Sequence, residues 1–280
     1  TCFAFLTRRL GPGARAANTR VTLDAGNAAT LDLQLVNWVG ERVGGQGGLL
    51  VFVAVTLLAV PCNLWAVRSL RRRERLGFSP AANPPGALQA ALRRPAFWAL
   101  VACFGLIWLN HGLLITYVLE LFADRGAGAA MAATAAACIG PAQVAGRLLF
   151  MLGEARVGNA RATLIALGSV VAASAVLWLA GLAPVLVFGF ALAQGAGAGL
   201  MSILRPVLIA EILGREGFGA ISGAVAISPI LASAAAPALG ALMLTAGGPV
   251  AVYAACLGMA LVGWAIAAAL LRGRLRGEAG

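Results

Sequence analysis

The chain has 280 residues, of which 61% are hydrophobic and 11% are charged. A typical soluble domain is about 25% charged, so this composition excludes an ordinary soluble globular protein. The net charge is +11 and all 21 basic residues are arginines. Most of them lie in short gaps between apolar runs, which is typical of membrane orientation signals rather than of a nucleic-acid interface.

Apolar segments long enough to cross a membrane follow one another along the chain. There are eight, at residues 21–40, 48–67, 96–119, 128–152, 161–181, 183–204, 218–245 and 249–271. We therefore expect an all-α, polytopic membrane helix bundle of about eight spans. The first segment is unusually polar, because Asp24 and Asp32 would each cost about 2.5–3.5 kcal/mol near the centre of a membrane helix. Whether these two residues are functional or mark a degenerate span is left open.

The arginines predict the orientation of these spans. Eight crossings place both ends of the chain on one side, together with 19 of the 21 arginines, and leave Arg42 and Arg125 on the other side. Positive charge accumulates on the cytoplasmic side of membrane proteins. We expect a multi-pass protein of the cell inner membrane with both termini in the cytoplasm. The exclusive use of Arg, with abundant Ala and Gly, suggests a GC-rich bacterial genome.

The longest connection covers residues 68–95, on the predicted cytoplasmic side. It opens with "RSLRRRERLG", continues through "SPAANPPG" and closes with "ALQAALRRP". A segment rich in Arg and Pro is typical of a hinge between two helix bundles. The stretch "ALQAALRR" fits either a short helix on the membrane surface or a plain solvated linker.

Three stretches resemble the major facilitator superfamily of secondary transporters. They are "IGPAQVAGRLLF", "QGAGAGLMSILRPVLIAEILGREGFGAISG" and "FWALVACFGLIWLNHGLLITY". In turn, they are similar to the family's eighth helix with its following loop, its tenth helix with the following loop, and its cavity-lining seventh helix. The chain as a whole resembles a fragment made of helices five to twelve. The resemblance implies that residues 1–67 end an N-terminal bundle, 68–95 form the central loop, and 96–280 form a C-terminal six-helix bundle.

The same resemblance implies a function. It points to a transporter that moves a small-molecule substrate by alternating access, works as a monomer in the lipid bilayer and needs no cofactor; coupling to protons is left open. One alternative is a degenerate or truncated fragment that does not transport. A membrane-embedded enzyme is less favoured, because the sequence has no HExxH motif, Ser/His pair, carboxylate cluster or metal-ligand cysteine spacing.

The candidate substrate-binding residues are polar side chains inside apolar runs. They are Asn110, His111, Tyr117 and Gln194. At 100° per residue, Cys103, Asn110 and Tyr117 share one helical face, which we expect to line a cavity because polar groups at membrane depth avoid lipid. The alternative for Asn110 is a structural hydrogen bond between helices, worth about 0.6 kcal/mol on average.

The family resemblance also implies an inner gate that involves Arg147 and Glu211. Arg147 and Glu211 could pair at the cytoplasmic ends of different spans; the alternative is that Arg147 is a topology signal alone. For Arg205, which precedes Pro206 at the cytoplasmic end of its span, we expect a structural or gating role.

A glycine-rich stretch follows Gln194. Gly195, Gly197 and Gly199 are similar to a phosphate-binding GxGxxG, but the third spacing is wrong and no strand precedes them. We predict that they pack helices closely instead.

Overall fold

The computed structural model describes residues 53–69, 86–153 and 157–277, with a few positions before residue 53. Helices account for the regular structure of these residues, and there is no strand among them. The predicted span 21–40 lies outside the described residues. Within 48–67, the structure describes the apolar helix Val53–Ser69.

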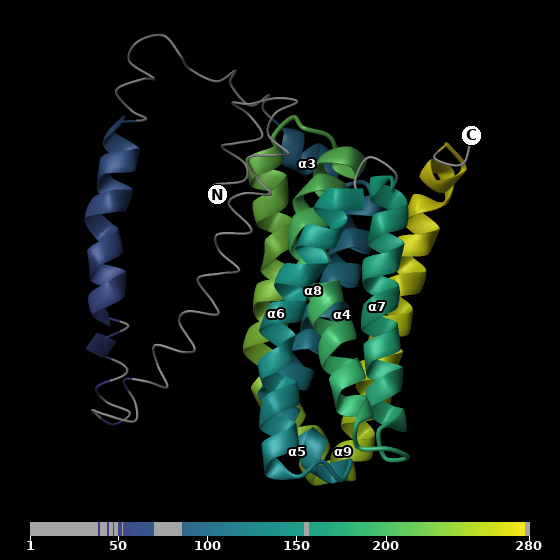
Figure 1. The fold of residues 1–280 in the computed structure, drawn as a ribbon. Coiled ribbons are helices and arrows are strands. Elements are labelled where there is room, and N and C mark those ends of the chain that lie inside the picture. Colours follow the sequence, from purple (N-terminus) through teal and green to yellow (C-terminus); the bar gives the residue numbers. More distant parts are fainter. Residues whose placement is uncertain are drawn as a thin grey trace.

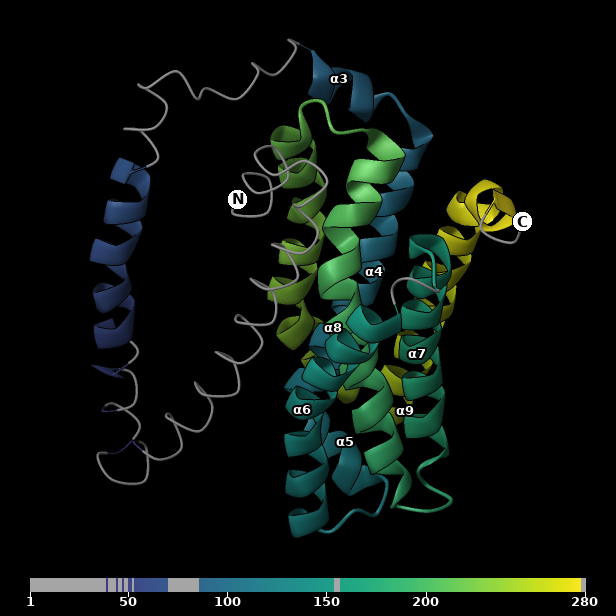
Figure 2. The same cartoon turned by 45° about the horizontal axis from the view of Figure 1, so that its top comes forward.

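Beyond residue 86 the chain forms a bundle of long helices that run side by side (Figure 1). The elements are α3 (Ala87–Leu92), α4 (Pro95–Thr116), α5 (Val118–Asp124), α6 (Ala129–Gly153), α7 (Asn159–Leu179), α8 (Leu186–Leu213) and α9 (Phe218–Gly277). The short helices α3 and α5 lie at opposite ends of the bundle (Figure 2). Among the described residues, five helices (α4, α6, α7, α8 and α9) are long and apolar enough to cross a membrane. The prediction of an all-α bundle is confirmed.

The outer surface of the bundle is apolar. Leu152 is 85% exposed, Leu149 69% and Ile230 65%. Water would penalise such a surface, whereas lipid does not, so the long apolar helices indicate a multi-pass membrane protein.

The last element, α9, consists of two helices joined at a sharp turn, and we call them its first and second arms. Gly248 has φ 64° and ψ −168°, which lies outside the helical region and is a conformation that glycine adopts more readily than other residues. Pro249 follows it. The first arm covers residues 218–247 and the second covers 249–277. The predicted segments 218–245 and 249–271 meet at this bend.

Both arms of α9 pack against α4. The first arm runs in the same direction as α4, because Ser228 Oγ donates to the Val101 carbonyl at 2.8 Å and the Tyr117 hydroxyl donates to the Pro237 carbonyl further along. The second arm runs back in the opposite direction, with Cys256 beside Asn110.

The contacts between α4 and the second arm have a seven-residue spacing. Cys103 Sγ donates to the Gly263 carbonyl at 3.3 Å, and Asn110 Nδ2 donates to the Cys256 carbonyl at 2.8 Å. Seven residues are close to two helical turns, so one face of α4 meets one face of an antiparallel partner. The Cys103 and Asn110 face, which we expected to line a cavity, packs against α9 instead.

The glycines that follow Gln194 bring α8 close to its neighbours. A Cβ on Gly195 would lie 2.5 Å from the Ile139 carbonyl oxygen of α6, and one on Gly197 would lie 2.8 Å from the Ala166 carbonyl oxygen of α7. These separations leave no room for a side chain. The prediction of close-packing glycines is confirmed, and this packing fixes where Gln194 stands.

The predicted end of the 183–204 segment is wrong, since α8 continues to Leu213. In this part of the helix the Arg205 guanidinium lies 5.1 Å from the centre of the Trp108 ring, and the buried Pro206 is accommodated within the helix.

An arginine caps the end of α8. The Arg94 guanidinium donates to the carbonyls of Ile212, at 2.8 Å, and Leu213, at 3.3 Å. A cation that binds the last carbonyls of a helix satisfies groups left without intrahelical partners. Nearby, α3 forms the short helix that was one of two alternatives for this stretch, and Ala91 is buried in the core.

Candidate functional site

A group of uncharged polar residues lies inside the apolar bundle. This inner polar cluster consists of Asn110 and His111 from α4, Ser174 from α7, Gln194 from α8 and the Cys256 carbonyl from α9. Asn110 and Gln194 are fully buried, and Ser174 is 2% exposed. Four helices that are distant in sequence therefore meet through polar contacts at one level of the bundle.

The amide of Asn110 is held from two sides. Its Nδ2 donates to the Ser174 hydroxyl at 3.1 Å and to the Cys256 carbonyl at 2.8 Å. Both amide hydrogens are therefore used, and Oδ1 points to the remaining partner in the cluster. That partner is Gln194, whose Nε2 lies 3.4 Å from Asn110 Oδ1.

Gln194 also contacts the single histidine of the chain. Its Nε2 lies 3.1 Å from His111 Nδ1 and donates to it, so the neutral imidazole carries its proton on Nε2. The other end of the Gln194 amide, Oε1, is buried and has no hydrogen-bond partner. Buried acceptors are rarely left unpaired, because each one costs about 1–3 kcal/mol.

A cavity of about 140 Å³ adjoins the cluster. Residues of α4, α6, α7 and α8 line it: Ile107, Trp108, His111, Gln143, Arg147, Val170, Gln194, Ala198, Met201 and Ser202. A cavity of about 150 Å³ holds a molecule the size of benzene, with about six non-hydrogen atoms. The cavity combines an apolar wall with amide, hydroxyl, imidazole and guanidinium groups, as binding sites for small molecules do.

Arg147 lies in the cavity wall. It is 6% exposed, and its Nε donates to the Gly199 carbonyl at 3.4 Å. Glu211, the expected partner, accepts a hydrogen bond from Asn159 Nδ2. The pairing of Arg147 with Glu211 stays a prediction, and so do the gating roles of both residues and of Arg205.

The structure brings together two of the four predicted substrate-binding residues at the cavity, His111 and Gln194. Asn110 lies behind them and bonds to three helices. Tyr117 is elsewhere: its ring packs against Gly240 and its hydroxyl bonds to Pro237. Substrate binding by these residues stays a prediction.

Sequence reasoning missed several cavity and cluster residues. Gln143 and Ser202 are polar residues in apolar runs, so the argument applied to Asn110 would have found them. Ser174 and Trp108 carry no comparable signal, because serines and tryptophans are common in membrane helices.

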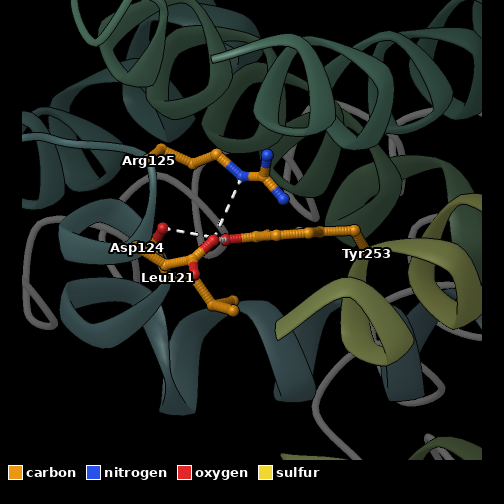
Figure 3. A network of polar contacts seen from close by, with 4 residues as sticks. All are labelled: Leu121, Asp124, Arg125 and Tyr253. Carbon is orange, nitrogen blue, oxygen red and sulfur yellow. Dashed lines mark hydrogen bonds and ion pairs between the residues drawn. The ribbon is translucent and has the colours of Figure 1, made fainter. Parts of the chain in front are cut away.

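A second polar group lies just beyond the end of α4, where α5 meets the start of the second arm of α9. This end cluster consists of the Leu121 carbonyl, Asp124, Arg125 and Tyr253 (Figure 3). The Tyr253 hydroxyl lies 2.9 Å from both the Leu121 carbonyl oxygen and Asp124 Oδ2, and it donates to one of them at a time. It ties the second arm of α9 to α5.

Arg125 completes the end cluster. Its guanidinium carbon lies 3.9 Å from the centre of the Tyr253 ring, and its Nε lies 3.4 Å from Asp124 Oδ2. A cation over an aromatic face and beside a carboxylate is attracted to both, although the buried Nε of Arg125 makes no hydrogen bond within the described residues. This arginine is one of the two that the topology prediction places on the outer side.

The described residues contain no group of three His, Cys, Asp or Glu side chains that could hold a metal ion. No protein-family model matches the chain, and no curated protein matches it.

Proposed function

We propose that the chain belongs to a secondary transporter of the major facilitator type, which moves a small solute across the inner membrane by alternating access. The observation that carries this proposal is a polar cavity in the middle of an apolar helix bundle. Polar groups at membrane depth are costly, and they are retained where they bind a solute or line a pathway.

The depth of the cavity supports the proposal. Gln194 stands eight residues after Leu186, the start of α8, and Ser202 stands sixteen residues after it. At 1.5 Å per residue, these positions are about 12 Å and about 24 Å along the helix. With Leu186 at one edge of a hydrocarbon layer about 30 Å thick, Gln194 lies near the midplane, the level at which secondary transporters bind their solutes, and Ser202 lies toward the other edge.

The chemistry of the lining supports binding rather than catalysis. Ser202 Oγ donates to the Gly199 carbonyl at 2.6 Å, and His111 Nδ1 faces an amide rather than a nucleophile. A hydrolytic site would need a nucleophile next to its base. We propose His111 and Gln194 as direct solute contacts, with Arg147 in the same wall.

Prolines inside the helices are compatible with alternating access. Pro141 lies inside α6, Pro206 inside α8, and Pro229 and Pro237 inside the first arm of α9. Each proline removes one backbone hydrogen bond and lets a membrane helix bend where its neighbours compensate. In this proposal, Arg147, Arg205 and Glu211 act at the inner ends as the helices rearrange.

The experiment that tests the proposal is cysteine accessibility in a cysteine-free background, in intact cells and in inverted membrane vesicles. Single cysteines replace Ala198 and Ser202 in the cavity wall, and Leu192→Cys serves as the control because Leu192 lies on the same helix and is 57% exposed on the lipid-facing surface. A membrane-impermeant, charged thiol reagent should label positions 198 and 202 from both sides of the membrane, and position 192 from neither.

Labelling of positions 198 and 202 from one side alone would contradict alternating access. A complete lack of labelling at both positions would show that the cavity is never open to water.

A further inference from the structure

We propose that the cavity selects solutes which donate a hydrogen bond to Gln194 Oε1, and that Asn110 is the positioning residue that turns this oxygen toward the solute. The inference rests on the proposed function, because it names the chemical class of solute for that site. A hydroxyl or amino group on the solute would satisfy it.

The backbone carbonyl of Cys256 fixes the orientation of the Asn110 amide. A backbone carbonyl can accept but never donate, so the Asn110 atom 2.8 Å from it must be the amide nitrogen. The Ser174 hydroxyl donates to the Val170 carbonyl at 3.1 Å, so it too accepts from Asn110. These two acceptors leave one orientation for the Asn110 amide.

The orientation of Asn110 in turn fixes that of the Gln194 amide. Since Asn110 Oδ1 is an acceptor, the Gln194 atom that faces it at 3.4 Å must be Nε2. The opposite orientation would place two oxygens against each other. The same Nε2 donates to His111 Nδ1 at 3.1 Å, which leaves the imidazole proton on Nε2.

This orientation of Gln194 leaves its Oε1 without a partner in the described part of the chain. This oxygen is fully buried, and Gln194 lines the cavity. A donor has to reach this oxygen through the cavity, and a bound solute displaces any water that would otherwise supply the hydrogen bond. A solute with a hydroxyl or amino group removes the cost of the unpaired acceptor, whereas a solute without a donor leaves that cost in place.

The test uses pairs of small probes that differ in donors. The pairs are ethylene glycol and its dimethyl ether, and glycolate and methoxyacetate, which cover neutral and anionic solutes and stay within about six non-hydrogen atoms. Binding to the full chain in lipid nanodiscs is followed by saturation-transfer NMR titration. We expect the donor member of at least one pair to bind about tenfold more tightly or better, the ratio that one buried, unpaired acceptor produces.

The variants separate positioning from folding. Gln194→Met has nearly the same shape and no acceptor, so the preference for the donor member should disappear. Asn110→Leu should reduce the ratio of the two affinities in a pair to about one, because the Gln194 amide can then turn over. The affinity of the donor-free member should stay the same. Ser174→Ala should keep the preference, because the Cys256 carbonyl still holds Asn110. Where Asn110→Leu does not fold, Asn110→Ala carries the same expectation.

Equal binding of both members in every pair would overturn the inference, as would a preference that survives in Gln194→Met. A loss of affinity in Asn110→Leu that is equal for both members would show that Asn110 is a structural residue only. Donor-selective binding without two-sided thiol access would contradict the transporter proposal and support the contact with Gln194. Two-sided thiol access with equal binding of both members would support the transporter proposal and contradict the contact with Gln194.

Discussion

The inner polar cluster and the end cluster hold the same parts of the bundle together with different chemical groups. Both tie α4 or α5 to the second arm of α9 through side chains that donate to backbone carbonyls. The end cluster uses charges, with Arg125 over the Tyr253 ring and beside Asp124. The inner polar cluster uses amides, a hydroxyl and an imidazole, and it leaves Gln194 Oε1 unpaired.

The difference follows from depth. Charged groups at a helix end are close to water and lipid headgroups, so an ion pair there has a low desolvation cost. In the hydrocarbon layer, neutral groups are less costly to bury. The end cluster therefore joins helices through charged groups, whereas the inner polar cluster joins them through neutral ones. Four substitutions test this contrast, from the largest expected effect to the smallest.

Tyr253→Ala should destabilise the chain most. The side chain is 1% exposed, lies under Arg125 and has its ring centre 6.4 Å from that of Trp178. Loss of a buried aromatic side chain costs about 3–5 kcal/mol. Unfolding in mixed micelles with increasing sodium dodecyl sulfate measures the change. Tyr253→Phe keeps the ring and should cost about 0.6 kcal/mol; equal losses in both variants would mean that the hydroxyl alone fastens the arm.

Gly195→Ala should have the next largest effect. The new Cβ would lie 2.5 Å from the Ile139 carbonyl oxygen, so α6 and α8 must move apart next to Gln194. Overpacking of this kind costs about 1–3 kcal/mol. The same unfolding titration measures it, and labelling of Ser202→Cys should change as well. Gly223→Ala is the matched control, because a Cβ there meets nothing within 4 Å; equal destabilisation by both substitutions would refute the close-packing role.

Arg125→Gln should show the charged character of the end cluster. It removes the ion pair with Asp124 and the cation over Tyr253, for a loss of about 1 kcal/mol after allowance for partial solvent screening. The loss should shrink in high salt, because mobile ions already weaken the pair in the unsubstituted chain. Unfolding at low and high salt measures this, and a loss independent of salt would point to packing alone.

Ser174→Ala should have the smallest effect. It removes one of the two acceptors of the Asn110 amide, and a polar contact between membrane helices is worth about 0.6 kcal/mol. No salt dependence is expected, since neither group is charged. Thr134→Ala is the control, because that hydroxyl bonds within its own helix to Ala130; unfolding of the two variants at the same midpoint would show that the Ser174 contact contributes nothing.

Polar residues in apolar runs were the most informative signal in the sequence. Asn110, His111 and Gln194 were predicted from that signal alone, and the structure places them in contact. Periodicity placed Tyr117 on the Asn110 face, but α4 ends at Thr116 and Tyr117 turns to the first arm of α9. A helical wheel assumes a continuous helix, so it fails where the helix stops.

The end cluster could not be predicted, because its members are far apart in the chain. Tyr253 and Leu121 are separated by 132 residues, and nothing near either one indicates its partner. Arg147 shows a related limit. The family resemblance implies a gate at this residue, which stays a prediction. Nothing in the sequence indicates that its side chain lies in the cavity wall, where Nε donates to the Gly199 carbonyl.

The bend at Gly248 has a mechanical consequence for α4. The two arms of α9 meet without an intervening loop, and both are bonded to α4, at Ser228 and Cys256. A displacement of either arm along α4 would therefore break one of these hydrogen bonds, so α4 and the two arms are held together as one unit. The inner polar cluster joins this unit to α7 and α8.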